Sequence, residues 1–347
     1  MRNEATLEQW AQLYEVAIKL KDLKPWENLR DMDLITIVKG VDVEPTVCSI
    51  MGQLGECYAI AAYDGYSAIN NFFTVVGSNN VPMNQMIRYH ENLMCNFGSR
   101  EELTKEELKL IKDLGLKFRG KNNWIYFRAI EPGYIPYMLD EEEVLNLTEI
   151  LRHLYMALKA MERGVVVDFE GGNTLARTYD EESELWLNYE IPIHEILSIG
   201  NEINYDIPVL GDELLVKRLK NLKNSNTSLE LDIAFLNSTV KDKNFDKPFL
   251  TRLAMIVDRK RGTVLAHYMM TPQNEVIVKE NLLGTIIDYS LQVGKPKEIW
   301  VRDKMMAAMI SGLCEQIGIN MKVSGYLKGI DTVVESFDRF RIQKVSH

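Results

Sequence analysis

The sequence lacks the short motifs that mark the best-known catalytic and nucleotide-binding sites. It contains no GxxxxGK(S/T) phosphate loop, no GxGxxG after a predicted strand, no HExxH, no GxSxG and no CxxC. The five histidines share no metal-ligand spacing; they are His90, His153, His194, His267 and His347. These absences exclude the usual signatures of P-loop nucleotide hydrolases, dinucleotide-binding enzymes, zinc proteases and serine hydrolases.

Cysteine is scarce, and long apolar runs are absent. The four cysteines are too widely spaced for a disulfide framework, which predicts reduced thiols and no zinc site. No apolar run approaches the roughly 18 residues that a membrane-spanning helix needs. The N-terminus mixes charges with apolar residues and lacks the apolar core of a signal peptide. We therefore expect a cytoplasmic protein without a membrane segment.

Positive charge is in the minority and is unevenly distributed. The formal net charge is −10. Residues 229–347 contain 17 lysines and arginines and 14 acidic residues, whereas the remaining 228 residues contain 23 and 36. The 228 residues before Leu229 carry a net negative charge and would repel a polyanion, so the charge distribution disfavours a nucleic-acid partner. We expect an unknown protein or small molecule as the partner, and no pattern predicts an oligomeric state.

The length of 347 residues predicts two domains rather than one. Strand-like runs alternate with amphipathic helical segments, which predicts a mixed α/β fold of hairpin-containing sheets flanked by helices. We predict an N-terminal domain at 1–164, a connecting region with a hairpin and a helix at 165–228, and a C-terminal domain at 229–347. The hairpin is expected to join strands at 165–169 and 185–189. The alternating pattern of 229–235 predicts a half-buried strand.

Two parts of the chain have the same predicted order of elements. A hairpin, a helix, a strand, a helix and a glycine follow one another in 47–115 and again in 253–318. An internal duplication would produce this order, but a hairpin followed by a crossover is also a common way to build a mixed sheet. Different strand orders in the two sheets would exclude duplication.

Several short segments resemble an uncharacterised bacterial family with two domains of unknown function. The first domain of that family is matched by 23–27 (LKPWE), 48–52 (CSIMG) and 55–58 (GECY). The second is matched by 229–232 (LELD), 252–258 (RLAMIVD) and 296–303 (PKEIWVRD). The resemblance implies the division into two domains, and it supplies no catalytic residue.

One group of acidic residues is the candidate for chemistry. The predicted order of elements in 253–340 resembles a ribonuclease-H-like sheet. The resemblance implies carboxylates on the first strand, at the end of the strand after the first helix, and on the last helix. Asp258, Asp303 and Glu335 are the candidate catalytic residues, with Asp331 and Asp338 also on the last helix. Carboxylates clustered in this way could hold the two Mg²⁺ ions of a phosphoryl-transfer enzyme, about 3.5–4 Å apart.

Each acid also has an ordinary structural explanation. Asp258 opens a predicted hairpin turn, where aspartate bonds to nearby backbone. Asp303 precedes a predicted helix that it can cap. The acids of the last helix centre on the side away from its apolar stripe, which predicts that they face water.

Three functional hypotheses follow, and they leave open whether the protein is an enzyme. The favoured one is a non-enzymatic binding or scaffold protein without a cofactor, which recognises a protein or small ligand in a cleft between its domains. The second is a metal-dependent phosphoryl-transfer enzyme, a ribonuclease-H-like nuclease that uses Asp258, Asp303 and Glu335 with Mg²⁺. The third is a catalytically inactive descendant of such an enzyme. Clustering of the three carboxylates would separate the second hypothesis from the other two.

Overall fold

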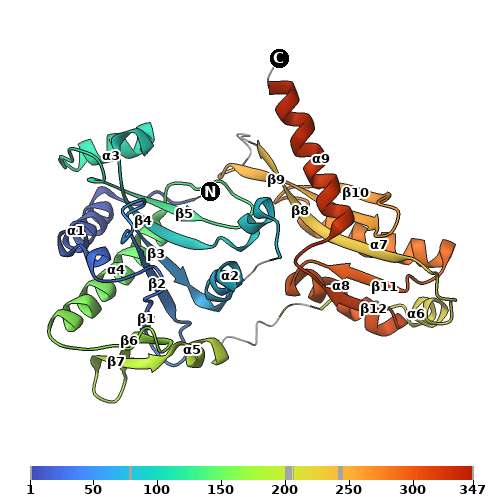
Figure 1. Cartoon of the computed structure of the whole chain (residues 1–347), viewed down its shortest axis with the longest axis horizontal. Coiled ribbons are helices and arrows are strands. Elements are labelled where there is room, and N and C mark those ends of the chain that lie inside the picture. The colour runs from blue at the N-terminus through green and yellow to red at the C-terminus, as the bar shows by residue number, and fades with distance from the viewer. Residues whose placement is uncertain (1, 78–79, 200–204, 206, 241–244, 346–347) are drawn as a thin grey trace. The chain divides into compact units, whose positions relative to one another are not determined.

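The computed structural model describes residues 2–77, 80–199, 205, 207–240 and 245–345, which form two compact units. The first unit comprises Met1–Val76, Tyr89–Ile203 and Lys243–Lys247, and the second comprises Gly77–Arg88, Asn204–Asp242 and Pro248–His347. Each unit contains one mixed β-sheet flanked by helices (Figure 1). The predicted mixed α/β fold in two domains is therefore confirmed.

The first unit is built on a seven-stranded sheet with the order β5-β4-β3-β2-β1-β6-β7. Its strands are β1 (Ile35–Val38), β2 (Thr46–Met51), β3 (Ala59–Asp64), β4 (Asn92–Gly98), β5 (Trp124–Ile130), β6 (Asn173–Asp180) and β7 (Leu185–Pro192). Neighbouring strands are antiparallel except β1 and β6, which pair in parallel. The sheet therefore ends in the β6–β7 hairpin on one side and in β5 on the other.

Two long helices cover one face of this sheet and lie side by side in Figure 1: α1 (Leu7–Leu23) and α4 (Glu141–Glu162). Each begins at a capping box, made by Thr6 with Gln9 and by Asp140 with Glu143, which satisfies backbone N–H groups of the first turn. The opposite face packs against α2 (Gly65–Gly77) and α5 (Ile193–Ile199). The remaining helices of the first unit before Asp140 are η1 (Pro25–Glu27), η3 (Arg100–Glu102) and α3 (Lys105–Asp113). The helix η2 (Met83–Tyr89) belongs to the second unit up to Arg88.

The second unit is built on a five-stranded sheet with the order β10-β9-β8-β11-β12. Its strands are β8 (Ser228–Val240), β9 (Phe249–Asp258), β10 (Val264–Met270), β11 (Glu298–Val301) and β12 (Asn320–Val323). The strands β8, β9 and β10 form an antiparallel meander, and β11 pairs in parallel with both β8 and β12. The strand β8 therefore lies at the centre of this sheet, between β9 and β11.

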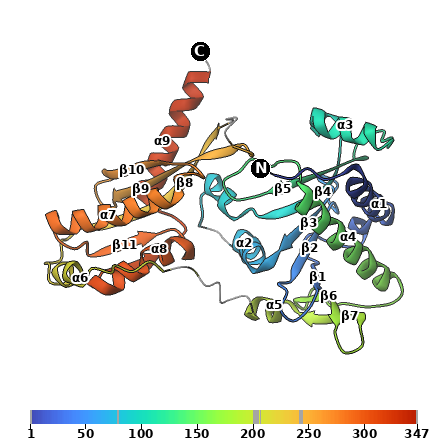
Figure 2. The same cartoon turned by 180° about the vertical axis from the view of Figure 1, so that it is seen from behind.

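Helices cover both faces of the second sheet. One apolar core joins the sheet to α6 (Glu213–Lys220), α7 (Glu275–Val293) and α8 (Lys304–Ile317), which are seen from behind in Figure 2. A smaller core on the other face joins it to α9 (Lys328–Val345). Because β8 lies between these two cores, residues 229–235 are buried on both faces, and the prediction of a half-buried strand is wrong.

The two sheets have different strand orders, so the predicted duplication is wrong. In the first sheet, β4 follows the β2–β3 hairpin and pairs antiparallel with β3. In the second, β11 follows the β9–β10 hairpin but pairs in parallel with β8, on the other side of the meander. The similar order of elements along the chain therefore reflects the frequent use of hairpins and crossovers in mixed sheets.

The predicted connecting region at 165–228 is divided between the two units. Its hairpin joins the first sheet because β6 pairs with β1, whereas α6 belongs to the core of the second unit. The first strand of the hairpin lies later than predicted, since 165–169 is not a strand, whereas the second begins at Leu185 as predicted. The Asp168 side chain instead accepts a hydrogen bond from the backbone N–H of Gly171, which makes a turn before β6.

Within the described residues, none of the helices has both the length and the apolar character needed to cross a membrane.

Candidate functional site

A buried group of two arginines and three aspartates lies at the centre of the second unit. We call Arg88, Asp232, Arg302, Asp303 and Asp331 the arginine–carboxylate cluster. Asp232 is on β8, Arg302 and Asp303 follow β11, Asp331 is in the first turn of α9, and Arg88 is on η2. The strand order brings these residues together, because β8 and β11 are neighbours and α9 packs on β8.

Asp232 is the most enclosed member of the cluster, with a side chain that is 0 % exposed. Its carboxylate accepts two hydrogen bonds from Arg88, Nη1 to Oδ1 at 3.0 Å and Nη2 to Oδ2 at 3.1 Å. The Nε of Arg302 donates to the same Oδ2 at 2.6 Å. Two guanidinium groups therefore share one buried carboxylate, and one of these pairs is bidentate.

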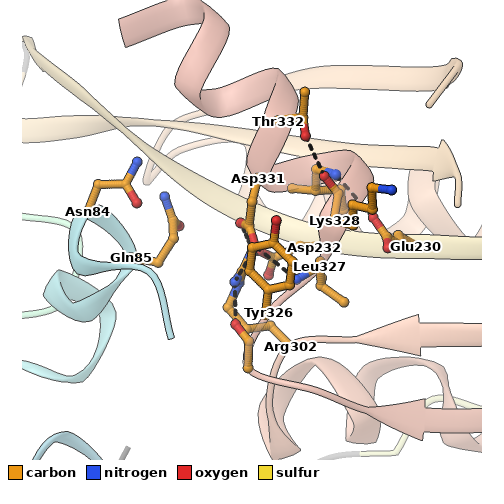
Figure 3. Close-up of polar contacts among 12 residues, drawn as sticks. Asn84, Gln85, Glu230, Asp232, Arg302, Tyr326, Leu327, Lys328, Asp331 and Thr332 are labelled. Atoms are coloured by element: carbon orange, nitrogen blue, oxygen red, sulfur yellow. Dashed lines mark hydrogen bonds and ion pairs between the residues drawn. The ribbon is translucent and has the colours of Figure 1, made fainter. Parts of the chain in front are cut away.

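Arg302 links Asp232 to the start of α9 (Figure 3). Its Nη2 donates to Asp331 Oδ1 at 2.5 Å and its Nη1 donates to the Gly325 carbonyl at 2.6 Å. Asp331 also accepts the backbone N–H of Leu327 at 2.8 Å through Oδ2. The guanidinium thus uses its fork of donors on two carboxylates and one carbonyl, an arrangement that lysine could not reproduce.

Asp303 completes the cluster while it caps a helix. Its Oδ1 accepts the backbone N–H of Met306 at 2.9 Å in the first turn of α8, and its Oδ2 accepts Arg88 Nη1 at 2.8 Å. The predicted capping role is confirmed. The second oxygen carries a charge-assisted bond that capping alone does not require.

A side-chain amide holds η2 against β8 beside the cluster. Gln85 donates from Nε2 to the Phe235 carbonyl at 2.9 Å and accepts the Phe235 N–H at 3.0 Å through Oε1. This contact lies where the β8–β9 ladder is interrupted after Phe235. Gln85 therefore satisfies backbone groups of Phe235 that lack a partner in the irregular ladder. The same contact fixes η2, which carries Arg88 one turn after Gln85.

The charges of the cluster favour an ionised Asp232. Burial acts to raise the pKa of Asp232, but the charges and hydrogen bonds of Arg88 and Arg302 outweigh burial and lower it. For Arg302, burial acts to lower the pKa, and the attraction of Asp232 and Asp331 raises it above its ordinary value. Asp232 and Arg302 are consequently stabilised in their charged forms by one another.

A second buried carboxylate lies two residues before Asp232 on the same face of β8. Glu230 accepts the backbone N–H groups of Gly329 at 2.7 Å and Ile330 at 3.0 Å, and Arg259 Nη1 at 2.6 Å. It therefore caps α9 from outside the helix. Burial raises the pKa of Glu230 above its ordinary value despite these partners. Gly329 is needed there, because an added Cβ would lie 2.9 Å from Glu230 Oε2.

The structure places Asp258 at the end of β9, where the turn begins, away from Asp303. Its Oδ1 accepts the backbone N–H groups of Lys260 and Arg261, both at 2.9 Å, as the turn interpretation predicts. Asp258 is level with Leu229 on β8, whereas β11 is in register with β8 up to Leu231. From usual strand spacing and rise, Asp258 and Asp303 are roughly 15 Å apart. They do not belong to one group.

The acids of α9 divide between the interior and the surface. Glu335 is exposed and pairs with Arg339 one turn later at 3.3 Å. Asp338 is partly exposed and accepts Asn84 Nδ2 at 3.4 Å. Asp331, in contrast, is 3 % exposed, so the prediction that it faces water is wrong. The first turn of α9 lies directly on β8, where a helical-wheel argument based on later apolar residues does not apply.

Sequence reasoning missed Asp232, Arg88 and the buried state of Asp331. The reason is that the sheet of the second unit begins with β8, whereas the sequence comparison with the ribonuclease-H-like order began at β9. Counted from β8, the chain order is three strands and then α7, β11, α8, β12 and α9. The signal available was the pair Glu230 and Asp232 within an apolar strand, which places two carboxylates on one face. Within the described part of the chain, no group of three or more histidine, cysteine or acidic side chains is arranged to hold a metal ion.

The fold and the cluster define a two-domain α/β protein with a buried ion network in its second unit. Residues 10–177 match the model of a domain of unknown function, DUF7309, and residues 215–338 match that of another, DUF6930. The chain therefore belongs to a two-domain family in which both domains are of unknown function. The comparison with curated proteins finds no match.

One solved structure with some likeness is the cryo-electron-microscopy structure of the simian T-cell lymphotropic virus intasome in complex with the PP2A regulatory subunit B56 gamma. The identity is 15 %, and the match covers 38 % of this chain and 44 % of that chain, with a TM-score of 0.19. The present chain thus spans less than half of that chain. The TM-score is too low for the likeness to bear on fold or function.

Proposed function

We propose that this is a non-enzymatic binding or scaffold protein whose second unit is a catalytically inactive descendant of a ribonuclease-H-like, metal-dependent phosphoryl-transfer enzyme. The observation that carries the proposal is the position of Arg88 and Arg302 on Asp232. Two guanidinium groups fill the coordination of the carboxylate around which an active site of this kind would be built.

The positions of the acids support descent from such an enzyme. Asp232 lies on the first strand, Asp303 follows the strand after the first helix of the sheet domain, and Asp331 lies on the last helix. These are the three positions that the ribonuclease-H-like resemblance implies for catalytic carboxylates. The order β8-β9-β10-α7-β11-α8-β12-α9 also agrees with that resemblance.

The residues present do not fit a pair of Mg²⁺ ions. All three carboxylates of the cluster bond to a guanidinium at 3.1 Å or less. Asp303 and Asp331 also accept backbone N–H groups. A divalent ion would meet two fixed positive charges and carboxylate oxygens that already have partners. No step of phosphoryl transfer is therefore assigned to these residues.

Mn²⁺ binding and hydrolysis by the full-length protein test this proposal. We expect no specific Mn²⁺ binding in isothermal titration, and no Mn²⁺-dependent hydrolysis of a labelled DNA–RNA hybrid or single-stranded RNA. The matched variant is Asp303→Asn, which can still cap α8 but lacks the negative charge that pairs with Arg88. Hydrolysis by the unaltered protein that Asp303→Asn abolishes would refute the proposal.

An arginine variant provides the positive counterpart. In Arg88→Gln, Asp232 and Asp303 lose a cation, so we expect Mn²⁺ to raise the Tm of this variant but not that of the unaltered protein. Arg259→Gln is the control, because it removes a cation from Glu230 without opening the cluster. Equal Tm responses of all three proteins would count against the view that the arginines stand in for metal ions.

The cytoplasm remains the proposed compartment. It is supported by four free cysteines, three of which are buried within apolar packing.

A further inference from the structure

Strand β7 forms one edge of the first sheet and presents a row of apolar side chains. Leu185, Leu187 and Tyr189 alternate along it and are 59 %, 42 % and 43 % exposed. They point to the face of the sheet on which α2 and α5 cover only the later residue Ile191. An edge strand with three exposed apolar residues in line is a surface on which another strand can be added.

The backbone of β7 is in the right phase to accept such a strand. Ile193 donates its N–H to the Gly172 carbonyl across the hairpin, which marks that pair as hydrogen-bonded. In an antiparallel ladder, hydrogen-bonded pairs recur at every second residue. The backbone groups of Leu185, Leu187 and Tyr189 therefore face β6, and those of Trp186, Asn188 and Glu190 face outward. Among the described residues, these three make no backbone hydrogen bond outside the hairpin ladder.

The strand is preformed rather than loose. Eight residues of β7 pair in continuous register with β6, from Asp180 with Leu185 to Asn173 with Pro192. On the covered face, Trp186 stacks on His153 of α4 with ring centroids 3.9 Å apart. Arg177 also lies over the Trp186 ring, at 5.1 Å. An added strand would consequently meet an ordered edge, and little conformational entropy would be lost on the side of β7.

The surroundings of this edge are acidic. Residues 178–196 contain six aspartates and glutamates and no lysine or arginine. Four of the acids, Asp180, Glu181, Glu182 and Glu184, lie at the turn of the hairpin, and Glu190 and Glu195 follow toward its other end. Glu190 projects from β7 itself and is exposed. The charge favours a basic partner over an acidic one.

We propose that β7 is the docking edge for an extended, basic segment of another protein, which adds to the first sheet as an eighth strand. Apolar side chains at every second position of the segment pack on Leu185, Leu187 and Tyr189. Its lysines and arginines meet the carboxylates of the hairpin turn and of Glu190. A second copy of the chain fits less well, because pairing of β7 with β7 would bring two acidic hairpins together. The site is separate from the arginine–carboxylate cluster and does not depend on its interpretation.

A synthetic peptide tests the edge in the full-length protein. The probe is a fluorescein-labelled octapeptide that alternates lysine with valine (KVKVKVKV), and binding is measured by fluorescence anisotropy. We expect saturable binding that weakens as NaCl is raised from 50 to 500 mM. Replacement of the two central residues, one valine and one lysine, by proline removes a backbone donor that faces β7 in either strand direction and should weaken binding at least tenfold, since a strand ladder needs that donor. The same peptide with glutamate in place of lysine should not bind.

Two variants of one residue give the matched test on the protein side. Asn188→Pro removes an outward N–H from β7 and leaves the N–H groups that face β6 in place. Asn188→Ala loses the same side chain, including its bond from Arg177, but keeps the N–H. We expect Asn188→Pro to weaken peptide binding at least tenfold and Asn188→Ala to bind like the unaltered protein. Circular dichroism verifies that both are folded. If Asn188→Pro is unfolded, Leu187→Thr replaces it and should weaken binding several-fold.

Three results would overturn the proposal. The first is equal binding of the valine and proline peptides. The second is unchanged binding by Asn188→Pro or, where it replaces that variant, by Leu187→Thr. The third is concentration-dependent self-association in sedimentation that the same substitution abolishes, since β7 would then serve a second copy of the chain.

Discussion

Asp232 has no contact with solvent, and its charge is balanced by two arginines that come from distant parts of the chain. Arg88 precedes it by 144 residues and Arg302 follows it by 70. A buried carboxylate that loses one such partner keeps its desolvation cost without the compensating attraction. The stability of the second unit is therefore sensitive to each arginine separately.

Arg302→Met should lower the free energy of unfolding by about 3–5 kcal/mol, because it leaves Asp232 and Asp331 buried with too few donors. Urea denaturation followed by circular dichroism measures the change. Arg302→Lys should restore only part of the loss, since one ammonium cannot reach both carboxylates and the Gly325 carbonyl in the same geometry.

Arg259→Met is the matched control for Arg302. Its partner Glu230 is equally buried, but Glu230 keeps two backbone donors, and its raised pKa allows it to take up a proton more readily. We therefore expect a clearly smaller loss than for Arg302→Met. Equal losses would mean that the coupling to Asp232 and Asp331 adds nothing.

His153 makes the stability of the first unit dependent on pH. Burial lowers the pKa of His153 to about 4, helped by the charge of Arg177, whose Nε donates to His153 Nδ1 at 3.2 Å. In the unfolded chain the pKa is about 6.5, so the unfolded state binds the proton more readily. The contribution to stability is complete above pH 6.5 and is lost as the pH falls toward 4.

Lowering the pH from 7 to 5 should therefore destabilise the unaltered protein more than His153→Gln, by on the order of 1 kcal/mol. Glutamine keeps an acceptor for Arg177 but does not titrate. Urea denaturation at the two pH values measures the difference, and other titrating groups cancel between the two proteins. An identical pH dependence in both would show that His153 is protonated as easily in the folded state as in the unfolded chain.

Residue roles that depend on local sequence could be predicted, and those that depend on distant partners could not. Asp258 and Asp303 were correctly placed in a turn and at a helix start, because both roles involve backbone within three residues. Asp331 was misplaced because its partner Arg302 follows β11, 29 residues earlier in the chain. No periodicity in the sequence reveals that Arg88 neutralises an aspartate on the strand β8.

At the scale of elements, α8 carries an extended segment on its surface. The segment 207–210 crosses the helix at Gly312, where an added Cβ would lie 2.3 Å from the Pro208 carbonyl oxygen. The amide of Gln316 holds the segment by accepting the N–H of Leu210 at 2.9 Å and donating to its carbonyl at 3.0 Å. A helix surface without a side chain at this point lets the two backbones approach.

Gly312→Ala should therefore destabilise the protein by about 1–3 kcal/mol, because the segment must move away from α8. Gly284→Ala on α7 is the control, since no atom lies within 4 Å of an added Cβ there. That change should stabilise the protein by up to about 1 kcal/mol through the better helix propensity of alanine. Urea denaturation measures both, and a stabilising Gly312→Ala would exclude the close packing.

Elements were predicted well where apolar periodicity is regular and poorly where tertiary contacts decide. The β9–β10 hairpin and the helices α7, α8 and α9 follow from their patterns. The half-buried prediction for β8 failed because α9 and η2 enclose its acidic face. The N–H of Gly329 on α9 bonds to Glu230, and Arg88 on η2 bonds to Asp232 and to the Ile233 carbonyl, so these groups take the place of water. The strand order could not be predicted either, because the alternation of apolar and polar residues does not show which strands pair with β8.

At the scale of the whole molecule, the boundaries in sequence and in space differ. Gly77–Arg88 lies within the first matched domain, residues 10–177, yet it belongs to the second compact unit. This segment contributes Gln85 and Arg88, which bond to Phe235 and Asp232. The second unit is therefore assembled from three stretches of the chain.

Arg88→Ala should consequently loosen the second unit and leave the first unchanged. Hydrogen exchange followed by mass spectrometry should show faster exchange in β8 and in the first turns of α8 and α9, and unaltered exchange in β1, β2 and β6. Arg128→Ala is the matched control, because Arg128 pairs with the buried Glu107 of α3 in the first unit. Faster exchange confined to the first sheet in Arg88→Ala would contradict the assignment of this segment.

The segment Gly77–Arg88 also has a consequence for a gene in which the two domains are separated. A gene that encoded only the second matched domain, residues 215–338, would carry Asp232 without Arg88 and the Phe235 backbone without Gln85. Such a gene would have to replace both partners or give up the buried aspartate. Separation of the two domains would therefore leave Asp232 buried with one of its two arginines, whereas moving them as a pair would keep both.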